Sequence, residues 1–241
     1  MKVISWDVGI KNLAYCIINS NNNNEILEWN SINLIPETPK CFISSCNKKT
    51  VKYCKFYDKE IHWCEKHCNI YNKLLKFPNS SIYLTKPKNV KHINCNNYDI
   101  NILRKNMIKL LDINILPHIF LYKIKYAIIE NQPTLKNPRM KAIADTLYTW
   151  ILIRGINDRK IIKSIHLISP SNKLKKYAGE LINSENKYKK TKLKSIEVVS
   201  DYLNNHNKEK YDYLQLFKKK DDLCDALLQG FYWIDKFNIK K

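Results

Sequence analysis

The stretch VISWDVGIKN, Val3–Asn12, decides how this sequence folds. Its first half is almost wholly apolar, which is typical of a strand that is buried on both faces of a sheet. Asp7 lies within this apolar run, and Gly9 and a polar turn follow it. An ionised carboxylate in a buried strand costs on the order of several kcal/mol unless a cation or hydrogen bonds compensate for its lost hydration. Asp7 is therefore a candidate functional residue.

The pattern that follows predicts an α/β fold. The first strand, Lys2–Val8, is followed after short turns by two more, Leu13–Ile18 and Glu25–Ile35, which favours an antiparallel meander. Hydrophobic periodicity then predicts alternating helices and strands: a helix around 102–111, a strand that ends on Glu130, a helix over 139–155 with Gly155 as its stop, a strand over 161–170, and amphipathic helices over 191–205 and 219–237. Hairpins followed by strand–helix–strand crossovers give a mixed sheet with helices on its faces.

Length and composition suit one substantial core with a small insertion. We expect residues 1–35 and 99–241 to form the core and residues 36–98 to form a Cys-rich insertion. No apolar run approaches the roughly 18 residues of a membrane span, and the chain starts directly with a strand. We therefore expect an intracellular, soluble protein that does not contact a membrane.

The charge balance favours a nucleic-acid partner. The chain has 42 Lys and Arg residues against 22 Asp and Glu residues, a formal net charge of +20 at pH 7. Such an excess gives phosphate binding that is sensitive to salt and largely independent of sequence. A solvated lysine surface and a surface for anionic membranes are the alternatives.

Three further acids lie in apolar surroundings. Glu130 ends a predicted strand, and Asp222 and Asp225 lie three residues apart on the last predicted helix, so they share a face. Carboxylates that converge from two strands and a helix repel one another unless cations neutralise them, and oxygen ligands suit Mg²⁺ or Mn²⁺. Two such ions about 3.5–4 Å apart can stabilise the attacking and leaving oxygens of a phosphodiester displacement. Taken singly, each acid has a plainer explanation, as a turn cap or as a favourable charge in the first turn of a helix.

Three motifs resemble the RNase H-like Holliday junction resolvases. They are SWDVGIKNLAYC, YAIIENQP and DDLCDALLQG, which contain the four acids named above. The most similar group is that of the poxvirus and related large-DNA-virus resolvases, which are akin to bacterial RuvC and to the fungal mitochondrial resolvases. The resemblance covers the N-terminal meander and most of residues 120–235, while residues 36–98 depart from the shortest members.

The resemblance implies an RNase H-like fold and a specific activity. It implies that Asp7, Glu130, Asp222 and Asp225 are catalytic and hold two Mg²⁺ or Mn²⁺ ions per active site. It also implies a homodimer that makes paired, symmetric nicks in a four-way DNA junction. If the protein is viral, its place of action would be the host-cell cytoplasm or a replication factory.

Other functions fit parts of the same pattern. An RNase H or another structure-specific nuclease of the same fold would use the same four acids on RNA–DNA hybrids or branched DNA. A zinc-containing DNA-binding protein without catalysis would use the acids only structurally. An actin-like ATPase domain is disfavoured, because the chain has four glycines in all and lacks glycine-rich phosphate loops.

The Cys-rich insertion predicts a structural zinc site. The motifs CFISSC and HWCEKHC flank a predicted hairpin around residues 57–59, and paired ligands at the two ends of a hairpin are typical of zinc ribbons and knuckles. The preferred ligand set is Cys41, Cys46, Cys64 and His67, and either Cys54 or Cys68 could replace one member. Buried or free thiols without metal are the alternative.

Lysine runs near the last helices are candidate DNA contacts. Lysine runs of this kind are equally often exposed surfaces that contact only solvent. Near an acidic metal site they could hold phosphates of the junction arms. The candidate DNA-binding residues are Lys11, Lys173, Lys175, Lys190, Lys192 and Lys194.

Overall fold

The structure is a computed structural model, and it describes residues 1–35, 39–56, 59–74, 86–90, 97–135, 137–172 and 187–239. Its contacts divide the chain into two compact units, of which the larger comprises Met1–Ile35 with Asp99–Lys241 and the smaller comprises Pro36–Tyr98. The expected boundaries lie at the same residues. The assignment of these parts as a nuclease core and a zinc-binding insertion stays a prediction.

The larger unit is built on a five-stranded mixed sheet with the order β3-β2-β1-β7-β8. Strands β1 (Lys2–Asp7), β2 (Leu13–Asn19) and β3 (Glu25–Ile32) pair antiparallel. Strands β7 (Tyr126–Glu130) and β8 (Ser164–Ile168) continue the sheet parallel to β1. Each parallel step requires a crossover connection, and helices supply it.

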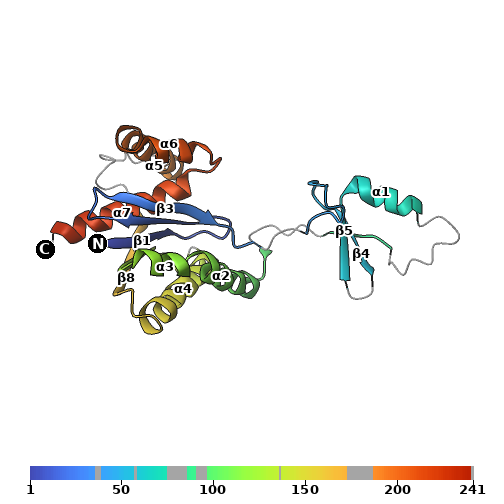
Figure 1. Cartoon of the computed structure of the whole chain (residues 1–241), viewed down its shortest axis with the longest axis horizontal. Coiled ribbons are helices and arrows are strands. Elements are labelled where there is room, and N and C mark those ends of the chain that lie inside the picture. The colour runs from blue at the N-terminus through green and yellow to red at the C-terminus, as the bar shows by residue number, and fades with distance from the viewer. Residues whose placement is uncertain are drawn as a thin grey trace. The chain divides into compact units, whose positions relative to one another are not determined.

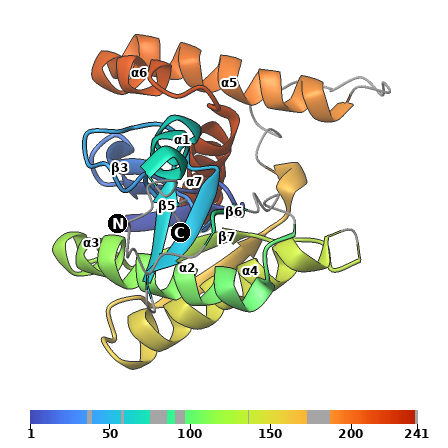
Figure 2. The ribbon, with the colours of Figure 1, turned by 90° about the vertical axis from the view of Figure 1, so that its right-hand side faces the viewer.

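Helices cover both faces of this sheet (Figure 1). On one face lie α2 (Ile100–Asn114), α3 (Leu116–Tyr122) and α4 (Pro138–Ile151), of which α4 contacts β7. On the other face α7 (Asp221–Ile239) lies against β1 and β2. Outside α7 lie α5 (Lys187–His206) and α6 (Lys208–Gln215), and Figure 2 shows both on the side away from α2 and α4. The predicted mixed sheet flanked by helices is confirmed.

Helix α7 approaches the sheet closely because glycine stands at its contact with β1 and β2. A Cβ atom on Gly230 would lie 2.5 Å from Cδ1 of Ile18 and 3.2 Å from Cβ of Ser5. Two buried hydrogen bonds fix the same contact: Nε1 of Trp29 donates to the Leu223 carbonyl at 2.9 Å, and Nε2 of Gln229 donates to the Trp6 carbonyl at 3.1 Å. The first turn of α7 is thereby held over the carboxyl end of β1.

Several predicted elements differ in extent from the structure. The predicted third strand over 25–35 ends at Ile32, and the predicted strand over 161–170 is shortened to β8. Neither α3 nor α6 is predicted from the sequence. The helix predicted to stop at Gly155 instead continues from α4 into a π-helical segment, Leu152–Asn157. Gly155 serves packing there, because a Cβ atom on it would lie 2.6 Å from Cδ1 of Ile162.

In its described residues, the smaller unit contains a three-stranded sheet and one helix. The predicted hairpin is formed by β4 (Lys52–Phe56) and β5 (Lys59–Trp63), and β6 (Lys88–Asn89) pairs with the other edge of β4. Helix α1 (Glu65–Leu74) follows β5 and was not predicted. The described core of this unit consists of the buried side chains of Cys54, Trp63, Cys68 and Tyr71. Ile61 is partly buried and packs against them.

Within the described ranges, none of the helices combines the length and the apolar character needed to cross a membrane.

Candidate functional site

Asp7 and Glu130 end neighbouring parallel strands of the larger unit. The register pairs Trp6 of β1 with Ile129 of β7, so the two acids come next along the two strands. Side chains alternate between the faces of a sheet. Val3 and Ile128 belong to the core cluster that contains α7, so Asp7 and Glu130, each an even number of residues further on, face the same side. Both are buried, with exposed fractions of 8% and 9%.

Helix α7 brings further acids over this side of the sheet. Asp222 lies in its first turn, is buried, and accepts a hydrogen bond from Nδ2 of Asn12 at 2.9 Å. Asn12 lies in the turn between β1 and β2, so this bond joins the turn after Asp7 to the start of α7. Asp225 lies one helical turn after Asp222 and is half-buried.

The charges of Asp7 and Asp222 act on each other. Burial raises the pKa of the Asp222 carboxyl, and the negative charge of Asp7 raises it further, although an ion pair with Lys219 opposes both effects. A buried carboxyl whose pKa is raised by a neighbouring carboxylate is typical of sites that bind a cation. The effect of Asp7 on Asp222 thus shows that these two acids lie close together, and the strand register places Asp7 beside Glu130.

Two lysines neutralise part of this acidic site. Lys219 pairs with Asp222, and Lys192 of α5 pairs with Asp221, which also lies 3.8 Å from the Lys219 ammonium. Although burial acts to raise it, these ammonium groups hold the pKa of Asp221 below its ordinary value. Ammonium ions therefore lie among the acids where a metal cation would also be attracted.

Three residues of this site carried no functional prediction from the sequence. They are Asn12, Lys219 and Asp221. The signals that could have indicated them are an Asn in the turn directly after Asp7 and a run of lysines directly before two acids. Neither signal indicates which side chains contact one another, because these contacts join elements that are far apart in the sequence.

The donor set fits hard divalent cations. The carboxylates are oxygen ligands, they are buried, and the two from the sheet stand on rigid strands. Across the part of the chain that the structure describes, no three carboxylates pack as tightly as the four ligand atoms of the smaller unit. Wider spacing is expected for carboxylates that bind two ions about 3.5–4 Å apart, because such ligands are distributed around both ions rather than around one.

The predicted DNA-binding lysines are found in different surroundings. Lys11 and Lys190 are exposed, whereas Lys192 and Lys194 are half-buried. Lys194 pairs with Glu197 at 2.7 Å, and Lys192 is the partner of Asp221. Lys173 and Lys175 lie outside the described residues. The binding of DNA by these lysines stays a prediction.

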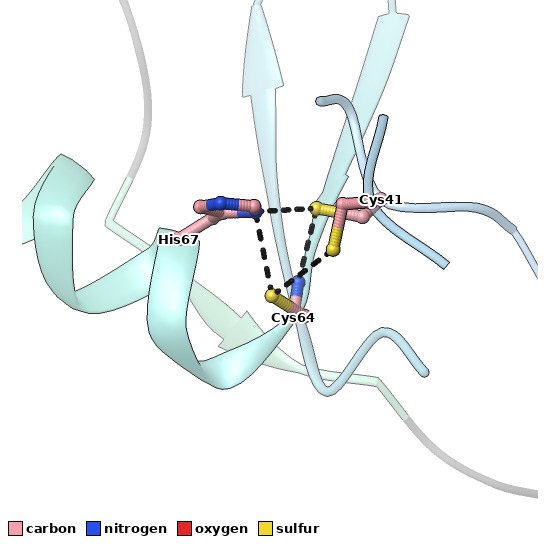
Figure 3. A group of neighbouring side chains, drawn as sticks. Cys41, Cys64 and His67 are labelled. Carbon is pink, nitrogen blue, oxygen red and sulfur yellow. Dashed lines mark hydrogen bonds between the residues drawn. The ribbon is translucent and has the colours of Figure 1, made fainter. Parts of the chain in front are cut away.

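In the smaller unit, the four predicted zinc ligands lie together. The ligand atoms of Cys41, Cys46, Cys64 and His67 are all within 4.8 Å of one another. Cys41, Cys64 and His67 point toward one another from a loop, from the end of β5 and from the first turn of α1 (Figure 3). Backbone N–H groups of His67 and Lys66 lower the pKa of the Cys64 thiol.

The sequence is similar to a viral protein along almost its whole length. No protein-family model matches it. An uncharacterized protein of Acanthamoeba polyphaga mimivirus is 33% identical, and the alignment covers 98% of this chain and 75% of the viral protein. This chain belongs to the same family as the mimivirus protein.

Holliday junction resolvases are among the solved structures to which this chain is similar. Fowlpox virus resolvase in complex with Holliday junction DNA is 14% identical, covers 98% of this chain and 99% of its own, and has a TM-score of 0.46. The yeast mitochondrial resolvase is 15% identical and covers 98% and 82% of the two chains, with a TM-score of 0.48. Thermus thermophilus RuvC bound to a Holliday junction substrate is 9% identical and covers 98% and 96%, also with a TM-score of 0.48.

These are the proteins that the three sequence motifs resemble, and the predicted resemblance is confirmed. Because the identities are low and the TM-scores are below 0.5, these structures do not establish the activity of this chain. That activity can be inferred only from the residues of the chain itself.

Proposed function

We propose that this protein is a metal-dependent endonuclease that resolves four-way DNA junctions. The observation that carries the proposal is the electrostatic interaction of buried Asp7 and Asp222, which lie at opposite ends of the sequence, beside Glu130 on the next strand. A fold that gathers buried acids in this way loses stability at that point. A cation that the acids bind during catalysis accounts for the arrangement.

The four acids have a shared role in this proposal. Asp7 and Glu130 offer carboxylate oxygens from rigid strand ends, and Asp222 and Asp225 offer theirs from one face of α7. Two Mg²⁺ or Mn²⁺ ions held by these oxygens would activate the attacking water and support the leaving oxygen of the phosphodiester. Asn12 orients the Asp222 carboxylate through its hydrogen bond, as a second-layer partner does in other metal sites.

Lys192 and Lys219 neutralise the acids while no metal is bound. Their ion pairs with Asp221 and Asp222 hold positive charge at the start of α7. If Asp222 held a metal ion, the ammonium group of Lys219 would be free to contact a phosphate of the substrate instead. The two lysines thus join the metal site to the basic surface that attracts DNA.

The four-way junction is the substrate favoured by the motifs that resemble junction resolvases, together with the net charge of +20. Two copies of the chain acting on opposing strands would make the paired, symmetric nicks. The proposed place of action is the host-cell cytoplasm or a viral replication factory, in keeping with the mimivirus relative.

The test is cleavage of end-labelled nucleic acids by the whole chain. A synthetic four-way junction, a linear duplex and an RNA–DNA hybrid of matched length are incubated in Mg²⁺, in Mn²⁺ and in EDTA. We expect paired nicks at symmetric positions of the junction alone, and none in EDTA. Cleavage of the hybrid in preference to the junction would instead indicate an RNase H activity. Tight junction binding without cleavage in either metal would indicate a DNA-binding protein whose acids are structural.

A further inference from the structure

The smaller unit holds four soft ligand atoms in a compact group that the carboxylate chemistry does not use. Cys41 and Cys46 come from the loop before β4, Cys64 follows β5, and His67 lies in the first turn of α1. The backbone ties these segments together, because the Phe42 amide donates to the His62 carbonyl at 2.8 Å. The loop is thereby fastened to the end of β5, beside Cys64.

The distances in this group match those around a tetrahedral zinc ion. With Zn–S bonds of about 2.3 Å and Zn–N bonds of about 2.0–2.1 Å, tetrahedral geometry places two sulfurs about 3.8 Å apart and a sulfur and a nitrogen about 3.5 Å apart. Sγ of Cys46 and Sγ of Cys64 are 3.7 Å apart. Nδ1 of His67 lies 3.5 Å from Sγ of Cys64 and 3.3 Å from Sγ of Cys41.

The same distances disfavour the alternatives without metal. A disulfide requires its sulfurs at about 2.05 Å, far closer than the 3.7 Å between Cys46 and Cys64. Thiols are weak hydrogen-bond donors and acceptors, so contacts among themselves hold Cys41 and Cys64 only weakly, and both are buried. We infer that Cys41, Cys46, Cys64 and Nδ1 of His67 bind one Zn²⁺ ion.

This zinc site is closed and therefore structural. Four protein ligands complete a tetrahedral shell and leave no position open for water or substrate. The Cys64 amide approaches Sγ of Cys41 at 3.5 Å, a backbone contact that supports a thiolate ligand from outside the metal shell. The ion would join the loop before β4 to the hairpin and to α1, which the small described core holds with few side chains.

Cys54 and Cys68, the alternative ligands, have other partners. Nε1 of Trp63 donates to Sγ of Cys54 at 3.2 Å, and Nδ2 of Asn72 donates to Sγ of Cys68 at 3.7 Å. Both cysteines are buried in the small core with Trp63 and Tyr71. They are matched controls, because they are buried thiols of the same unit that lie outside the four-ligand group.

The test is the zinc content of the whole chain, measured by elemental analysis after purification without chelator and dialysis. We expect one zinc ion per chain in the wild type and in Cys54→Ser and Cys68→Ser, and almost none in Cys64→Ser. Absence of zinc from wild-type protein supplied with the metal would overturn the inference. Loss of zinc from Cys54→Ser together with its retention in Cys64→Ser would also overturn it.

A second variant keeps the test decisive if Cys64→Ser does not fold. His67→Cys replaces the nitrogen ligand with a sulfur and should retain the metal. After replacement of zinc by Co²⁺, the wild type should show the absorption of a site with three sulfurs and one nitrogen, and His67→Cys that of a site with four sulfurs. Identical Co²⁺ spectra for the two proteins would exclude His67 as a ligand. The outcome is independent of nuclease activity, so the zinc inference and the proposed function fail separately.

Discussion

The larger unit places a five-stranded sheet between two layers of helices, whereas the described core of the smaller unit comprises Cys54, Trp63, Cys68 and Tyr71 with Ile61 against them. Each unit also gathers side chains that can bind metal. In the larger unit these are hard carboxylates at the edge of a complete core, and in the smaller unit they are soft ligands that join separate segments. In the two proposals above, metal would serve chemistry in the first unit and folding in the second.

Removal of zinc should have the largest effect, and it should destabilise the smaller unit but not the larger one. Structural zinc contributes binding free energy of about 10–16 kcal/mol in small zinc domains at pH 7, which exceeds what so small a core can supply. After zinc is stripped with a strong chelator, amides of β4, β5 and α1 should lose protection from hydrogen exchange. Amides of β1, β2 and α7 should keep theirs.

Zinc re-addition is the control for this experiment, and it should restore protection in the smaller unit. Equal protection of both units with and without zinc would contradict the account, as would loss of protection in both.

Removal of the Asn12 side chain should have an intermediate effect on the carboxylate site. Asn12→Ala deletes the hydrogen bond that orients Asp222, and loss of such an outer partner costs about 10–100-fold in metal affinity or activity. We expect a higher Mg²⁺ concentration for half-maximal junction cleavage, with an unchanged melting temperature of the smaller unit. Asn205→Ala, an exposed change on α5, is the control. An unaltered Mg²⁺ dependence in Asn12→Ala would remove Asn12 from the site.

The smallest predicted effect is a gain of stability on neutralising Asp7. Burial and then the charge of Asp7 raise the pKa of Asp222, so this carboxyl favours the folded state when protonated. Its contribution is lost as the pH rises from the ordinary carboxyl range through the raised pKa. In EDTA at neutral pH, Asp7→Asn should therefore melt a few degrees higher than the wild type, since about 1 kcal/mol shifts the melting temperature by about 2–4 °C in a domain of this size.

Added Mg²⁺ should reverse this order, because binding to the folded wild type stabilises it. A lower melting temperature for Asp7→Asn in EDTA would show that the acids do not repel one another.

The sequence predicts the sheet well because its signals are local. An apolar β1 and short turns before β2 and β3 define the meander, and Asp7 and Glu130 are conspicuous because carboxylates rarely end buried strands. The ligand spacing in the smaller unit is likewise local, since Cys64 and His67 are separated by less than one helical turn.

The remainder depends on contacts between distant segments. Gly155 reads as a helix stop, but its role is to admit Ile162, which lies seven residues further along the chain. Asn12 and Asp222 are 210 residues apart, and neither residue alone indicates the hydrogen bond between them. Local patterns therefore predict elements and candidate acids, whereas the partners of the acids require the packed structure.

The most direct test of the account is single-turnover cleavage of a labelled four-way junction in Mg²⁺ by the wild type, Asp7→Asn and Asp201→Asn. Asp201 is exposed on α5, so Asp201→Asn changes the net charge equally without touching the site. We predict paired nicks by the wild type and by Asp201→Asn. Asp7→Asn should bind the junction as tightly but cleave it more than about 100-fold more slowly, beyond the range for loss of an outer partner. Cleavage by Asp7→Asn at the wild-type rate would contradict the central claim.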